Sequence, residues 1–189
     1  ALNINAGGFQ NSASGSGALQ NNTSGYQNTA SGSQALNLNT SGHQNAASGT
    51  GALGSNTAGI QNVASGSTSL TNNTTGSQNT AIGALSGRYI ADKITNATIL
   101  INSIMVGFNA SPLADNQTNQ VVVGHNAVGL GSNTSVLGNL STIFARVWGR
   151  LLLGTSLDNG TDQLQVAGTI LASPGTTANQ VVIKSQLDL

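Results

Sequence analysis

Few side chains in this sequence are suited to metal binding. The 189 residues include two histidines, His43 and His125, and no cysteine. No acidic residue lies near either histidine in sequence, so we expect both to be structural or simply exposed. Residues 158–162 read Asp-Asn-Gly-Thr-Asp, but a calcium cage needs further carboxylates, and a β-turn is the better interpretation. We therefore expect no metal and no other cofactor.

The sequence also lacks combinations of side chains that are typical of catalytic sites. Serine and glycine are plentiful, yet no combination of serine, histidine and acid, no pair of carboxylates and no phosphate-binding glycine loop stands out. All 5 acidic residues are aspartates. The glycines recur at fixed intervals, which is typical of a structural repeat. We predict that this chain is not an enzyme.

Aromatic residues offer the best candidates for contact with a binding partner. One position that recurs every seventeen residues is occupied in turn by Phe9, Tyr26, His43, Ile60 and Ser77. If this position faces solvent, the rings of Tyr26 and His43 are able to stack on sugars. If it lies at a seam between subunits, the same rings are packing residues. We favour packing, because ring stacking along a coil is common.

A second candidate contact is centred on the only tryptophan. Trp148 lies between two cations, Arg146 and Arg150. An exposed tryptophan beside arginines is typical of a receptor or glycan anchor, because these side chains dominate binding at many interfaces. A junction between two modules would bury the same ring, and we favour that structural role.

A repeat of seventeen residues runs through the first half of the chain. The dipeptide Gln-Asn recurs at residues 10, 27, 44, 61 and 78. One unit is close to Gln-Asn-x-Ala-Ser-Gly-x-x-Ala-Leu-x-x-Asn-Thr-Ser-Gly-x, where x varies. Its fixed columns are Ala13, Ala30, Ala47, Ala64 and Ala81, then Leu19, Leu36, Leu53 and Leu70, and Gly15, Gly32, Gly49, Gly66 and Gly83. This self-similarity predicts a stacked repeat architecture.

Each unit has the length and the turn signals of one β-coil. Two glycine-marked turns leave room for two short strands and contradict helical periodicity. Equivalent residues of adjacent coils then lie about 4.8 Å apart, so the alanine and leucine columns become internal and the asparagines form ladders. The Asn-x-Ser/Thr triplets, such as the one at Asn39, fit ladder and turn positions better than glycosylation. The sequence predicts an all-β fold of stacked β-coils.

The predicted interior is thin, because it consists mainly of alanine with one leucine per coil. At about 25 cal/mol per Å² of buried apolar area, these columns hardly offset the cost of ordering a whole unit. The simplest remedy is that other copies of the chain bury more surface. We therefore expect a fibrous homotrimer in which three coils pack around an axis, since symmetric closed assemblies are the common solution.

The regular register ends near residue 87, which divides the chain into three expected regions. Residues 1–87 form the repeat shaft, residues 88–148 an irregular β-roll with a loop near residues 110–119, and residues 149–189 a carboxy-terminal β segment. Short apolar runs closed by glycine predict the strands of the second region. Because the chain starts at Ala1 and its single methionine is Met105, we expect it to belong to a longer protein or to be processed.

Parts of the second half resemble known fibrous proteins. The segments NTAIGALSG at residues 79–87 and NQVVVGHNAVGLGSNTSVLGN at residues 119–139 are similar to the head repeats of trimeric autotransporter adhesins, which form a left-handed parallel β-roll. Residues 149–172 and 178–189 resemble segments of phage tail-fibre proteins. The resemblance implies a trimeric fibre that attaches to a host surface, and it brings no enzymatic residue.

Composition narrows the function further. The formal net charge of zero removes the electrostatic case for nucleic acid, and no apolar run is long enough to span a membrane. We expect a structural and host-attachment segment of a phage tail fibre in the virion. Its expected partners are sister chains, other fibre or baseplate proteins, and a host cell-surface receptor, with a glycan as one candidate. The head of a bacterial trimeric adhesin at the cell surface is the alternative, and an ice-binding solenoid is a remote one.

Overall fold

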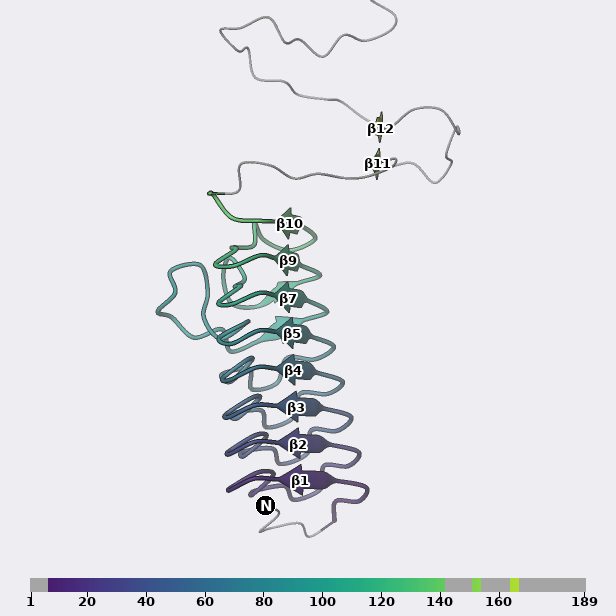
Figure 1. Cartoon of the computed structure of the whole chain (residues 1–189). Coiled ribbons are helices and arrows are strands. Elements are labelled where there is room, and N and C mark those ends of the chain that lie inside the picture. The colour runs from purple at the N-terminus through teal and green to yellow at the C-terminus, as the bar shows by residue number, and fades with distance from the viewer. Residues whose placement is uncertain (1–6, 142–150, 154–163, 167–189) are drawn as a thin grey trace, which may run out of the picture. The chain divides into compact units, whose positions relative to one another are not determined.

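The computed structural model describes residues 7–141, 151–153 and 164–166. The regular secondary structure of these residues is β-strand, without a helix. The chain divides into two compact units, residues 1–145 and 146–189. The first unit is a parallel β-solenoid, in which the backbone winds in stacked coils (Figure 1). The prediction of an all-β fold of stacked β-coils is confirmed.

Within the described residues, short strands line up along the solenoid. Eight of them form one parallel sheet in the order β1-β2-β3-β4-β5-β7-β9-β10, and β6 pairs with β8. Their bounds are β1 (Ser12–Ser14), β2 (Thr29–Ser31), β3 (Ala46–Ser48), β4 (Val63–Ser65), β5 (Thr80–Ile82), β6 (Leu100–Ile101), β7 (Ile104–Val106), β8 (Gln117–Thr118), β9 (Val121–Val123) and β10 (Ser135–Leu137). In the second unit, β11 (Leu151–Leu153) and β12 (Leu164–Val166) pair in parallel.

The seventeen-residue repeat sets the register of the large sheet. From β1 to β5, each strand pairs with the next at a displacement of seventeen residues. Thr80 then pairs with Ile104, Ile104 with Val121, and Val121 with Ser135. The coil between β5 and β7 is thus longer than the seventeen-residue repeat. The coil between β7 and β9 is again seventeen residues long, and the coil between β9 and β10 is shorter. The sheet continues from β5 to β7 across residue 87.

The extra residues of the longest coil form a hairpin at residues 88–96. Tyr89 and Asn96 make an antiparallel bridge across it. After the hairpin, the carbonyl of Thr98 accepts a hydrogen bond from the backbone N–H of Thr74 on the preceding coil at 2.8 Å. The teal loop that leaves the stack near β5 in Figure 1 belongs to this part of the chain. Within residues 110–119, where the loop was expected, Pro112 is buried and β8 pairs with β6.

Alanine and leucine columns line the interior of the coils. All four leucines of the repeat, and its alanines after the first coil, are at most 2% exposed. Ala13, on the first coil, is partly buried. Met105 and Val122 take the alanine position in later coils and are equally buried. The prediction of internal columns is confirmed, and a single chain is enough to bury them.

Two ladders of asparagine side chains complete the interior. In one, Nδ2 and the backbone N–H of Asn45 both donate to Oδ1 of Asn28, at 3.1 Å each, and the same pattern repeats along the column. In the other, Nδ2 of Asn39 donates to Oδ1 of Asn22 at 2.7 Å. These four asparagines are buried. The bonds between coils therefore satisfy polar groups that would otherwise be costly to remove from water.

The ladders change the argument for a trimer. The expectation that sister copies complete the interior assumed that one chain is too poor in apolar groups to close its own coil. That premise is wrong, because one chain buries its alanines, leucines and asparagines together. Hydrogen-bonded amides take the place of large apolar side chains. Any trimer must therefore use the outer surface of the solenoid.

Close stacking of the coils requires glycine in two columns. At Gly49, φ is 129° and a Cβ would lie 2.6 Å from the carbonyl oxygen of Gly66 on the next coil. At Gly42, a Cβ would lie 2.3 Å from Oδ1 of Asn39. Neither column has room for a side chain, so these glycines permit the distance at which the ladders form.

Other corners of the coil use the left-handed conformation without glycine. One column has φ between 51° and 62° and comprises Gln10, Gln27, Gln44, Gln61, Gln78, Asn102, Asn119 and Asn133. The buried leucines of the repeat have φ between 47° and 50°. This conformation costs a non-glycine residue about 1–2 kcal/mol, and asparagine tolerates it better than most. The later coils therefore place asparagine where the repeat has glutamine.

Replacing Asn45 by aspartate tests the ladder. The change keeps the side-chain shape but removes two donated hydrogen bonds and buries a carboxylate. We expect the free energy of unfolding, measured by urea denaturation, to fall by about 3 kcal/mol or more at neutral pH. Burial raises the pKa of a carboxyl group in the folded state, so part of the loss should be recovered as the pH falls toward about 3.9. Gln44→Glu makes the same change on an exposed neighbour, and an equal loss there would contradict the ladder.

Replacing Gln61 by asparagine tests the left-handed corner. Gln61 is exposed and has a φ of 56°. Asparagine relieves this conformation, so we expect the free energy of unfolding to rise by about 0.5–1 kcal/mol. Gln61→Ala shortens the side chain without relieving the backbone and serves as the control. A gain from alanine as large as the gain from asparagine would show that the backbone is not the cause.

Candidate functional site

The ring column packs against itself within one chain. Phe9 and Tyr26 are stacked with ring centroids 4.8 Å apart, and Tyr26 and His43 with centroids 4.4 Å apart. Both faces of Tyr26 are therefore covered by neighbouring rings. Farther along the column, the backbone N–H of Ile60 donates to Oγ of Ser77 at 3.0 Å. A sugar that stacks on an aromatic face finds no free face on Tyr26, whereas Phe9 at the start of the column is 55% exposed. The predicted packing of this column at a seam between subunits stays a prediction.

The other predicted contact lies outside the described residues. Trp148, Arg146 and Arg150 all belong to the part of the chain that the structure does not describe, as do residues 158–162. The tryptophan anchor and the β-turn at the acidic segment stay predictions.

The two histidines belong to different columns. His125 stacks on Phe108 with ring centroids 5.4 Å apart, whereas His43 stacks on Tyr26. Over the described residues, no three or more metal-binding side chains come together. The same part of the chain contains no helix long and apolar enough to cross a membrane.

The Asn-x-Ser/Thr triplets of the repeat are structural. Asn22, Asn39 and Asn73 are buried, and Nδ2 of each donates to a glycine carbonyl three residues further on, at 2.8–2.9 Å. A sugar on any of these buried nitrogen atoms would break the hydrogen bond to the glycine carbonyl. The predicted ladder or turn role of these triplets is confirmed.

Charged side chains of the described solenoid gather around the hairpin. Residues 7–141 contain Arg88, Asp92, Lys93 and Asp115. The carboxylate of Asp115 accepts from the backbone N–H groups of Thr98 at 2.9 Å and Ile99 at 2.7 Å, which anchors the chain after the hairpin. Nζ of Lys93 donates to the carbonyl of Asn109 at 2.7 Å, and burial lowers the pKa of this ammonium group. These two charges therefore fix the hairpin against the coils.

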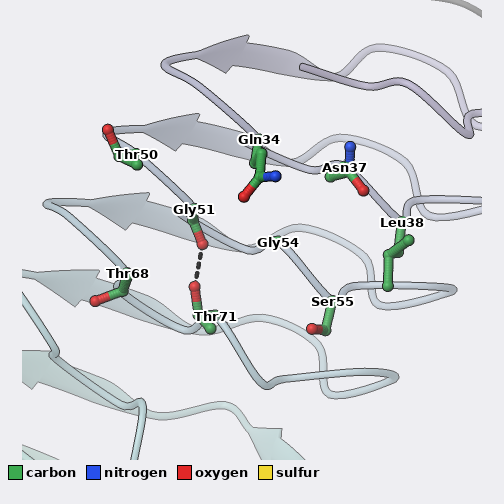
Figure 2. A pocket seen from close by; sticks show the side chains of 9 residues that line it. All are labelled: Gln34, Asn37, Leu38, Thr50, Gly51, Gly54, Ser55, Thr68 and Thr71. Atoms are coloured by element: carbon green, nitrogen blue, oxygen red, sulfur yellow. Dashed lines mark hydrogen bonds between the residues drawn. The ribbon is translucent and has the colours of Figure 1, made fainter. Parts of the chain in front are cut away.

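A polar hollow interrupts the wall of the repeat (Figure 2). Its volume is about 300 Å³, and its floor is the backbone of Gly51 and Gly54. The adjacent coils supply the walls, with Gln34, Asn37 and Leu38 on one side and Thr68 and Thr71 on the other. The hydroxyl of Thr71 donates to the carbonyl of Gly51, as the dashed line in Figure 2 shows. The hollow exists because one coil lacks two side chains that its neighbours have.

The sequence contained the signal for this hollow. Gly51 and Gly54 fall seventeen residues after Gln34 and Asn37, at positions where the repeat varies. The candidate residues were chosen for aromatic or charged side chains, so the two glycines were not among them. The hollow arises where side chains are missing. A scan for glycine in variable columns would have found it.

A second, apolar hollow of about 630 Å³ lies at the last coil of the described stretch. Leu130, Leu137 and Leu140 line it and are 71%, 70% and 109% exposed. Nothing in the described residues covers these side chains.

No protein-family model, curated protein or solved structure matches this chain.

The hairpin gives a pH-dependent prediction. The carboxylate of Asp92 accepts from Oγ1 of Thr95 at 2.5 Å and from the backbone N–H groups of Ile94 and Thr95 at 2.8 Å each. These bonds lower the pKa of Asp92 below its usual value of 3.8, and the bond from the Thr95 hydroxyl has the largest effect. Because the folded-state pKa is depressed, the turn is stable above about pH 4 and weakens as the pH falls through the lowered value.

Nuclear magnetic resonance measures this effect at the amide protons of Ile94 and Thr95. Their shifts should titrate with a midpoint below 3.8, and Asp92→Ala should abolish the titration while the circular dichroism of the shaft stays unchanged. A midpoint above the usual carboxyl value would contradict the described turn.

Proposed function

We propose that this chain is a structural and host-attachment segment of a phage tail fibre, assembled as a homotrimer in the virion and without catalysis. The observation that carries the proposal is an exposed apolar strip on the outer face of the large sheet. It lies on the strands of a solenoid whose own chain already fills its interior.

The outer face of the sheet changes character along the solenoid. On β1 to β3 it carries serine, threonine and alanine. From β4 onward it carries Val63, Ile82, Ile104 and Leu137, which are 42%, 47%, 41% and 70% exposed. At about 4.8 Å per coil, this strip is about 19 Å long. A contiguous apolar surface of this kind on a soluble protein marks an interaction site.

Sister copies are the partner that fits this strip best. Its strands carry no charged residue, so copies approach without electrostatic repulsion. Every copy has the same coil spacing, so the strips of three chains lie side by side in register around a common axis. The resulting rod suits a fibre, whose task is reach and repeated contact. The tail-fibre resemblance of residues 149–172 and 178–189 supports a virion location.

A bacterial trimeric adhesin is the second candidate, favoured by the resemblance of residues 119–139 to adhesin head repeats. The genes next to the one that encodes this chain separate the two. Virion genes support the fibre, whereas a membrane-anchor barrel in the same reading frame contradicts it. The remote ice-binding alternative is weakened, because the hydroxyls of Thr23, Thr40 and Thr57 donate to carbonyls of the next coil at 2.9–3.1 Å.

Sedimentation of the full chain tests the trimer. We expect a trimer for the natural sequence and a monomer for Ile104→Asp combined with Val121→Asp, because buried unpaired carboxylates on the strip oppose association. Val121 pairs with Ile104 in register and faces the same side of the sheet. Ser14→Asp combined with Ser31→Asp changes the same face on its polar part and should leave the trimer intact. A natural chain that sediments as a monomer at all accessible concentrations would contradict the proposal.

A further inference from the structure

We propose that the hollow over Gly51 and Gly54 binds one unit of a neutral saccharide. The proposal rests on the host-attachment function and names the ligand class that this part of the solenoid recognises. It also moves the expected glycan contact away from the ring column, where both faces of Tyr26 are covered.

The hollow is a local break in an otherwise repeated wall. The preceding coil has Gln34 and Asn37 at the two equivalent positions, and the following coil has Thr68 and Thr71. Only the coil between them has glycine at both, so two side chains are missing where walls remain on either side. The resulting volume of about 300 Å³ is at the lower end of the range for small-ligand sites.

Polar groups of the walls are fixed and available for a ligand. Nδ2 of Asn37 donates to the carbonyl of Gly17 at 2.8 Å and to Oε1 of Gln20 at 3.2 Å. These bonds fix the amide and leave its Oδ1 as an acceptor on the side of the hollow (Figure 2). The side chains of Gln34 and Ser55 have no hydrogen-bond partner among the described residues. The hollow therefore offers the side-chain amide of Gln34, Oδ1 of Asn37 and the hydroxyl of Ser55.

The chemistry of this lining selects a neutral sugar. None of the residues that line the hollow is charged, so a metal ion finds no carboxylate there. Arg88 is not among them but donates from Nη1 to Oγ1 of Thr68 at 3.3 Å, and an acidic sugar is therefore the necessary counterpart to the neutral ones. A sugar hydroxyl both donates and accepts, which matches amides and hydroxyls. The side chain of Leu38, which is 45% exposed, supplies an apolar wall for the C–H face of a sugar ring. An apolar ligand would leave the polar groups unsatisfied.

A substitution taken from the protein itself closes the hollow. Gly54→Asn introduces the residue that the preceding coil has at the equivalent position, Asn37, so the coil should fold as before. Ala58→Asn adds the same side chain to an exposed position of the same coil and is the control. Gln34→Ala removes one proposed hydrogen-bonding group without filling the hollow.

Saturation-transfer NMR on the full chain provides the readout. The probes are glucose, galactose, mannose and N-acetylglucosamine, with glucuronate as an acidic counterpart. We expect at least one neutral sugar to bind, with an affinity lowered about tenfold or more by Gly54→Asn, lowered less by Gln34→Ala and unchanged by Ala58→Asn. Unchanged circular dichroism and melting temperature of Gly54→Asn show that the coil still folds. Binding of no neutral sugar, binding of glucuronate alone, or equal binding by Gly54→Asn would overturn the proposal.

Adhesion of the labelled chain to host cells separates this proposal from the broader one. If the natural chain and Gly54→Asn adhere equally, the hollow is not the site of host attachment, and host attachment itself stands. If the natural chain does not adhere, host attachment fails, and the NMR titration still decides whether the hollow binds a sugar.

Discussion

Hydrogen bonding between asparagine side chains of successive coils is the constraint on which the structure depends. Asn45 reaches Asn28 at 3.1 Å only if the coils stack as closely as neighbouring strands of a sheet. That distance leaves no room for a Cβ at Gly42 or Gly49. Seventeen residues must then close around the ladders, which places glutamine and leucine in left-handed corners. Repeat length, glycine columns and corner residues all follow from the ladders.

This constraint leaves the outer positions free to vary, and the proposed functions lie there. The strip proposed to join sister chains consists of outward-facing residues of the strands, such as Ile82 and Ile104. The hollow proposed to bind a sugar arises where Gly51 and Gly54 replace longer side chains. The hairpin at residues 88–96 is an insertion between two coils, and Asp115 and Lys93 hold it in place. A rigid interior thus supports a surface that changes from coil to coil.

Much of the fold could be predicted because the repeat is regular. The spacing of Ala30, Ala47 and Leu36 predicted the internal columns, and the recurring asparagines predicted the ladders. The return of the register between Ile104 and Val121 was missed, because the hairpin shifts it out of phase with the first five strands. The complete interior was missed because counting apolar area ignores buried amides. The hollow could not be recognised from chemical types alone, since it depends on which coils lie next to each other.

Hydrogen exchange of the side-chain amides tests the central claim most directly. In a nitrogen-labelled full chain, the Nδ2 protons of Asn28, Asn45 and Asn62 should exchange at least about a thousandfold more slowly than the Nε2 protons of the exposed Gln44, because the ladder must open before they meet water. Similar exchange rates for the buried asparagines and Gln44 would contradict a solenoid held together by asparagine ladders.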